Sequence, residues 1–133
     1  MIGLDTNALI RLLTQDDPAQ AARVAQRLEP FDTVPESVLL NNIVLVETLW
    51  TLRRVYGFDR KAMQDLLAQL LSAQTFRFEN REVTSKAAAL FSSTAADFSD
   101  CLIAVQNAHM GCDLTLSFDK AMAKLPQVVV LAS

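Results

Sequence analysis

Residues 1–10, MIGLDTNALI, contain a short apolar strand that ends abruptly in an aspartate. Ile2 and Leu4 occupy the alternate positions of a short buried strand, and Asp5 follows them directly. Two interpretations of Asp5 are open. An aspartate before an apolar helical segment is a good helix N-cap. The carboxyl ends of parallel strands are also where ligands bind in α/β proteins, so Asp5 is equally a candidate functional acid.

Outward from this stretch, short apolar runs alternate with amphipathic helical segments along the whole chain. The alternation predicts a three-layer α/β/α sandwich with a central, mainly parallel sheet of four to five strands, in a single domain of residues 1–133. The expected strands are residues 2–4, 36–42, 75–79, 113–119 and 128–132. The expected helices are residues 8–14, 16–30, 42–58, 58–73, 82–94, 96–111 and 119–125.

Several helices carry recognisable start signals. Asp17 is a natural N-cap with Pro18 at the first helical position, and Asp59 caps the helix that follows it. Asn42 is expected to cap the helix of residues 42–58. The apolar face of that helix is expected to consist of Ile43, Val46, Leu49 and Trp50.

Composition sets broad limits on the class of protein. A chain of 133 residues with 51% hydrophobic residues, 3 Gly and 4 Pro suits one compact domain. Because the first predicted strand starts at residue 2, we expect no leader peptide, and no apolar run is long enough to cross a bilayer. We therefore expect a cytoplasmic protein with no membrane partner. Cys101 and Cys112 form no CxxC pair and are expected to be buried free thiols, and the one histidine, His109, gives little support for a catalytic triad.

The net charge of −3 does not exclude a nucleic-acid partner. Phosphate binding usually leaves a basic footprint on a protein surface. If four of the 15 Asp and Glu surround bound cations, however, the remaining charge is close to balanced. The acidic composition therefore says little about the substrate.

Four further acids stand at unusual places in the predicted elements. Glu47 interrupts the apolar run VLVETLW, and it is either a functional acid or an edge residue paired with Arg54. Two aspartates lie at the start of a predicted helix, and another ends a predicted strand as Asp5 does. A three-layer fold is able to bring all of these acids to one rim. These three aspartates are Asp97, Asp100 and Asp119.

Three stretches, residues 1–13, 42–58 and 96–122, resemble the PIN domain family, and more narrowly its VapC-type toxin ribonucleases. By that resemblance, four acids form a catalytic and metal-binding quartet, and Asp97 is either a fifth metal ligand or a helix cap. Thr6, Asn7 and Ser117 then hydrogen-bond to the carboxylates or to metal-bound water, unless they are plain helix caps. The quartet consists of Asp5, Glu47, Asp100 and Asp119.

Clustered carboxylates imply a metal ion because they repel one another in a partly dry pocket unless a cation neutralises them. Oxygen ligands favour Mg²⁺, with Mn²⁺ able to substitute. The expected reaction is hydrolysis of phosphodiester bonds by metal activation of water, and the resemblance implies that the substrate is RNA. The resemblance implies an endoribonuclease that leaves a 5′-phosphate and a 3′-hydroxyl. Arg11 and Lys120 are the candidate substrate-binding cations, with a solvated or ion-paired surface role as the alternative.

The resemblance also implies partners. A toxin of this type is expected to pair with a small antitoxin protein and to form a homodimer, for which residues 45–50 and 66–71 offer apolar surfaces unless they belong to the core.

The alternatives to a toxin ribonuclease are a solitary RNA-processing nuclease and a catalytically silent binding module. A phosphatase with an aspartate nucleophile is disfavoured because such enzymes carry a second Asp two residues after the first, where this chain has Asn7.

Overall fold

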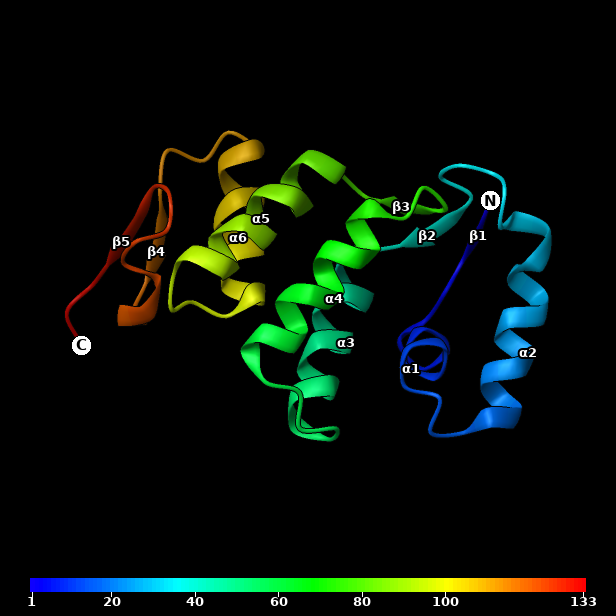
Figure 1. The fold of residues 1–133 in the computed structure, drawn as a ribbon. Helices are drawn as coiled ribbons and strands as arrows, with labels where there is room; N and C mark the ends of the chain where they lie inside the picture. Colours follow the sequence, from blue (N-terminus) through cyan, green and yellow to red (C-terminus); the bar gives the residue numbers. More distant parts are fainter. The chain divides into compact units, whose positions relative to one another are not determined.

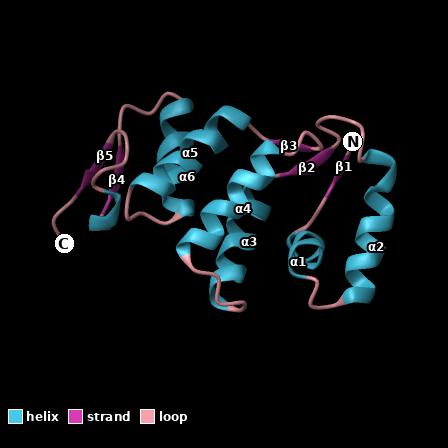
Figure 2. Ribbon diagram, viewed as in Figure 1, coloured by secondary structure: helices cyan, strands magenta, loops and turns pink.

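The structure, a computed structural model, describes residues 1–133, which form two compact units, Met1–Glu79 and Asn80–Ser133. The first four strands are separated by pairs of longer α-helices, and only a short 3₁₀ turn separates the last two strands (Figure 2). The expectation of a single domain over residues 1–133 stays a prediction. No helix is long and apolar enough to span a membrane.

The first unit consists of a three-stranded parallel sheet and four α-helices (Figure 1). The strand order is β1-β2-β3, with Ile2 opposite Val38 and Val38 opposite Phe76. The central strand carries two fully buried residues, Val38 and Leu40, which anchor the core of this unit. Its elements are β1 (Ile2–Gly3), α1 (Thr6–Thr14), α2 (Pro18–Leu28), the 3₁₀ turn η1 (Glu29–Phe31), β2 (Val38–Leu40), α3 (Asn42–Arg54), α4 (Arg60–Ser72) and β3 (Phe76–Phe78).

The predicted start signals of α2 and α4 are confirmed. The Asp17 carboxylate accepts a hydrogen bond from the backbone N–H of Gln20, and the Asp59 carboxylate does the same for Ala62. The prediction that Asn42 caps α3 is wrong by one residue. Asn41 has the extended backbone of an N-cap and accepts from Val44 at 2.9 Å, whereas Asn42 is already helical.

The predicted buried face of α3 is also wrong in part. Ile43 and Trp50 are 69% and 60% exposed, and only Leu49 of the four expected core residues is buried. Helix α3 has apolar residues on two sides, so its periodicity fits either face. Packing against the rest of the unit selects the other face, which consists of Val44, Leu45, Thr48, Leu49 and Leu52. The segments of residues 45–50 and 66–71, considered as dimer surfaces, thus contribute mainly to the core, with Trp50 as the main exception.

The second unit consists of two packed helices and a two-stranded parallel sheet. Helices α5 and α6 contact each other extensively. The rings of Phe91 and Phe98 meet edge to face, with centroids 6.2 Å apart, at the start of α6. In the sheet, Thr115 lies opposite Val128. Its elements are α5 (Arg81–Ser93), α6 (Phe98–His109), β4 (Thr115–Ser117), the 3₁₀ turn η2 (Lys120–Met122) and β5 (Val128–Val130).

The α/β class and the parallel strand pairing are confirmed. The strands do not, however, form the single hydrogen-bonded sheet that was expected. Five strands are present, as predicted, and they divide into a sheet of three and a sheet of two. The two-residue strand β1 pairs with β2 only, and β4 pairs with β5 only.

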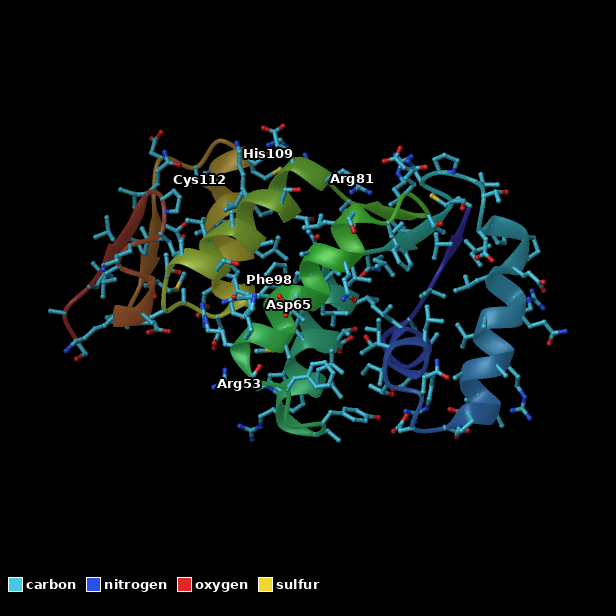
Figure 3. The ribbon with its side chains drawn as sticks, in the orientation of Figure 1. Arg53, Asp65, Arg81, Phe98, His109 and Cys112 are labelled. Carbon is cyan, nitrogen blue, oxygen red and sulfur yellow. The ribbon has the colours of Figure 1, made fainter.

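The cysteines are both free, and only Cys101 is buried. Cys112 is exposed because it lies in the irregular segment after α6, so the expectation that both thiols are buried is wrong for it (Figure 3). His109 is exposed at the last turn of α6.

Candidate functional site

A cleft of ≈ 590 Å³ in the first unit brings several of the predicted site residues together. One wall is the start of α1, the helix that follows β1, and the other is the middle of α3, the helix that follows β2. Both helices begin beyond the carboxyl ends of neighbouring parallel strands, the edge at which ligands collect in α/β proteins. The lining residues are Asp5, Thr6, Asn7, Val46, Glu47, Trp50 and Thr51.

Asp5 caps α1 and also lines this cleft. Its backbone is extended, and its Oδ1 accepts a hydrogen bond of 2.9 Å from the backbone N–H of Ala8. The capping bond occupies one carboxylate oxygen and does not involve Oδ2. The two interpretations of Asp5 are therefore compatible, because one oxygen stabilises the helix while the other can serve a ligand.

Thr6 orients Glu47 within the cleft. The hydroxyl of Thr6 donates a hydrogen bond of 2.7 Å to Oε1 of Glu47, which lies 41 residues away in the sequence. Glu47 forms no ion pair with Arg54, whose guanidinium instead lies over the ring of Trp50. The alternative of a Glu47–Arg54 ion pair is therefore not observed.

Three carboxylates of the second unit lie within electrostatic reach of one another. Partial burial raises the pKa of Asp100 above its usual 3.8, and the negative charges of Asp119 and Asp97 raise it further. Neither Asp100 nor Asp119 has a Lys or Arg partner. The surroundings of Asp100 thus favour loss of its negative charge, which is the condition that a bound cation relieves.

Asp97 and Asp119 differ in how they use their carboxylates. Asp97 occupies the N-cap position of α6, but its side chain makes no capping hydrogen bond. Asp119 does cap, because its Oδ1 accepts from the backbone N–H of Ala121 at 2.9 Å. The helix-cap alternative for Asp97 is thereby weakened, whereas Asp119 resembles Asp5 in committing one oxygen to the fold.

Ser117 supports the backbone at Asp119 rather than its carboxylate. The Ser117 hydroxyl accepts from the backbone N–H of Asp119 at 2.9 Å and lies 3.2 Å from the sulfur of Met122. This pair of contacts fixes the turn after β4 and thus the position from which Asp119 projects.

The two candidate substrate-binding cations have different surroundings. Arg11 donates to Gln20 at 2.7 Å, to Tyr56 at 3.2 Å and to Asp16 at 3.3 Å. This is the ion-paired surface role that was the alternative for Arg11. Lys120 is exposed, directly after Asp119.

The donor chemistry of the acids fits a hard divalent cation. All five are carboxylates, and oxygen ligands suit Mg²⁺ and Mn²⁺. Burial raises the pKa of Asp100 and the negative charges of Asp119 and Asp97 raise it further, an effect that a bound cation would oppose. No group of three or more His, Cys, Asp or Glu is assembled in a way that could hold a metal ion. Asp5 and Glu47 belong to the first unit, and the other three acids belong to the second.

Trp50 is the cleft residue that the sequence pattern failed to identify, since its apolar character predicted a core position. It follows Glu47 by three residues, so the two side chains share one face of α3. This three-residue spacing from a candidate functional acid is the feature of the sequence that could have identified Trp50 as a site residue.

Comparison with known proteins gave three findings. The family model described as "PIN domain" matches residues 2–128. The VapC ribonuclease of Aquifex aeolicus (strain VF5) is 25% identical over 122 residues, which cover 92% of this chain and 90% of that protein. A chain of a solved toxin-antitoxin complex from Klebsiella pneumoniae is 19% identical, with a TM-score of 0.37 and coverage of 97% of this chain and 95% of that one.

Proposed function

The chain belongs to the PIN domain family, and on that premise we propose that it is a metal-dependent endoribonuclease, the toxin of a toxin–antitoxin pair. The similarity to a VapC ribonuclease over 92% of the chain supports the proposed activity. The observation that carries the proposal is the cleft at the start of α1 and the middle of α3, in which Thr6 orients Glu47 beside Asp5.

We assign the metal to Asp5, Glu47, Asp100 and Asp119, with Asp97 as an auxiliary ligand. Mg²⁺ is the proposed ion, with Mn²⁺ as a substitute, and it would neutralise the scissile phosphate and activate water for attack on phosphorus. Thr6 holds Glu47 in position, and Ser117 fixes the turn that carries Asp119. Asn7 lines the same cleft.

RNA is the proposed substrate, and Lys120 is the better placed of the two candidate cations. Lys120 directly follows Asp119 in the sequence and is exposed, whereas the guanidinium of Arg11 already has three protein partners. A small antitoxin protein and a second copy of the chain are the proposed protein partners, in the cytoplasm where the RNA substrate occurs.

The decisive experiment measures RNA cleavage and metal binding with the same proteins. Total RNA is incubated with the native protein in Mg²⁺, in Mn²⁺ and in EDTA, and Mn²⁺ binding is measured separately by calorimetry. Asp100→Asn is compared with Asp113→Asn, which removes an exposed acid of the same unit outside the proposed site. We expect cleavage and Mn²⁺ binding in the native protein and in Asp113→Asn, and loss of both in Asp100→Asn.

Equal cleavage by the native protein and Asp100→Asn would indicate a contaminating nuclease and remove the support for the mechanism. A native protein that neither binds Mn²⁺ nor cuts RNA would be a silent binding module. The toxin role is tested by induced expression in a bacterial host, where the native chain should arrest growth and Asp100→Asn should not. Cleavage without growth arrest would favour a solitary RNA-processing nuclease.

A further inference from the structure

Trp50 is a large aromatic side chain left in solvent beside the candidate catalytic acids. It is 60% exposed and lines the same cleft as Asp5 and Glu47. Burying an indole ring is strongly favourable, so a ring left exposed next to a functional cleft is a candidate for ligand contact. It lies one helical turn after Glu47, on the same face of α3.

A positive charge accompanies this ring. The guanidinium carbon of Arg54 lies 5.5 Å from the centroid of the Trp50 ring, in the geometry of a cation–π contact. Arg53 and Arg54 are both exposed at the C-terminal end of α3, and Figure 3 labels Arg53 there. The indole and the guanidinium thus provide two planar groups and a positive charge at one edge of the cleft.

Aromatic rings next to arginine are the means by which proteins hold unpaired nucleotides. Bases stack on the ring, because every base has a π face, and arginine adds stacking surface or a contact to phosphate. We propose that Trp50 is a substrate-binding residue whose indole stacks on an RNA base adjacent to the bond that is cut, with Arg54 beside it contacting the RNA backbone. The assignment rests on the proposed ribonuclease function.

The composition of the cleft favours RNA over a protein partner at this position. An aromatic anchor in a protein interface is typically surrounded by contacts that exclude water. Apart from Trp50, the cleft has only one apolar lining residue, Val46. The polar remainder suits a hydrated, charged ligand, and it consists of Asp5, Thr6, Asn7, Glu47 and Thr51.

Trp50 is the only tryptophan of the chain, so intrinsic fluorescence reports on this site alone. The experiment uses full-length Asp100→Asn in EDTA, to prevent cleavage, titrated with a 12-nucleotide oligoadenylate. Stacking of adenine on the indole should quench the emission. The affinity is measured in parallel by fluorescence anisotropy of the same oligonucleotide carrying a 5′ label, so that variants without tryptophan can be compared.

Three variants separate stacking from general packing. Trp50→Leu keeps an apolar side chain but removes the ring, and it should weaken oligonucleotide binding by about 5- to 150-fold, the usual effect of losing one stacked base. Trp50→Phe keeps a smaller ring and should recover most of the affinity. Ile43→Ala is the matched control, because Ile43 is an exposed apolar residue of α3 that does not line the cleft.

Kinetics of the otherwise native protein in Mn²⁺ give an independent readout. Trp50→Leu should raise KM by a similar factor with little change in kcat, since the ring binds substrate before and during the reaction. A Trp50→Leu variant with native KM and native oligonucleotide affinity would overturn the proposal, as would equal loss in Trp50→Leu and Trp50→Phe. An emission that shifts to the blue with protein concentration and is not quenched by RNA would overturn it in favour of a protein contact.

Failure of this proposal is distinguishable from failure of the proposed function. Metal-dependent cleavage by Trp50→Leu with native kinetic constants would leave the nuclease assignment intact and remove only the stacking role. Quenching by RNA in a native chain that cuts nothing in Mg²⁺ or Mn²⁺ would support the stacking role and contradict the nuclease.

Discussion

The hydroxyl of Thr6 donates a hydrogen bond of 2.7 Å to Oε1 of Glu47 and thereby joins the first turn of α1 to the middle of α3. The donor is neutral, so the contact fixes the position of the glutamate without placing a positive charge beside it. A Lys or Arg partner in the same place would have neutralised the charge that a metal ion needs. The contact is thus suited to holding a ligand in place for a cation.

Thr6→Val tests this contact because valine has nearly the same shape without the hydroxyl. We expect Mn²⁺ affinity to fall by about 10- to 100-fold, the usual effect of removing a group that orients a metal ligand. Stability should change by only about 1 kcal/mol, the net value of one hydrogen bond. Calorimetric titration and urea unfolding measure the two effects. Thr6→Ser retains the donor and should behave as the native protein, and a Thr6→Val variant with native Mn²⁺ affinity would show that the contact is only structural.

Asp5 offers a way to separate folding from function. Asn caps helices as well as Asp does, so Asp5→Asn should keep native stability while it loses RNA cleavage and metal binding. Asp5→Ala should also lose RNA cleavage and metal binding, and in addition it should lose about 1 kcal/mol of stability because the helix cap is missing. Urea unfolding in EDTA and RNA cleavage in Mn²⁺ make the comparison. Full activity in Asp5→Asn would reduce Asp5 to a helix cap.

Crowded carboxylates in the second unit should destabilise the metal-free protein. Burial, Asp119 and Asp97 raise the pKa of Asp100, which means that its charged form is disfavoured in the folded chain. Asp100→Asn should therefore raise the melting temperature in EDTA. The gain in the free energy of unfolding should be small, on the order of 0.5 kcal/mol, because solvent screens a partly exposed group. Mg²⁺ should stabilise the native protein and leave Asp100→Asn unchanged. A lower melting temperature for Asp100→Asn in EDTA would contradict the inferred repulsion.

A polar network in the first unit should make stability depend on acid pH. The hydroxyl of Tyr56 donates to Asp16 at 2.6 Å, and this bond, with contributions from Thr14 and Arg11, lowers the pKa of Asp16 below its usual 3.8. A carboxyl with a lowered folded-state pKa contributes stability above its unfolded pKa, and that contribution is lost as the pH falls through the folded value.

Tyr56→Phe removes the donor from this network. The variant should be less stable than the native protein at neutral pH. The difference should shrink as the pH falls from about 3.8 through the lowered pKa that Asp16 has in the native chain, where Asp16 loses its charge. Urea unfolding at several pH values measures the difference. A stability gap that does not change with pH would assign the effect to packing of the ring instead of to the Asp16 hydrogen bond.

Local features of the fold could be predicted from sequence because the interactions are local. The caps at Asp17 and Asp59 depend on a carboxylate and a backbone N–H three residues later, and both are found. The buried face of α3 could not be predicted in the same way. Ile43 and Trp50 have the same periodicity as the true core residues, and only packing with distant segments selects between the two faces.

The charged residues of the candidate site could be predicted from the sequence, whereas its aromatic residue could not. Acids at strand ends and inside apolar runs identified Asp5 and Glu47, which line one cleft. Trp50 carries no such mark, because an apolar residue on a helix resembles core until its exposure is known. The hydrogen bond from Thr6 to Glu47 likewise required the structure, since it joins residues 41 positions apart.

The capping hydrogen bond of Asp5 uses only one of its two carboxylate oxygens, and this has an evolutionary consequence. Aspartate and asparagine codons differ by a single base, and an asparagine at this position retains the helix cap while lacking the charge. One nucleotide change is thus expected to convert an active chain into an inert one that folds normally. A host under selection to escape the activity would have a short mutational path that leaves a stable protein behind.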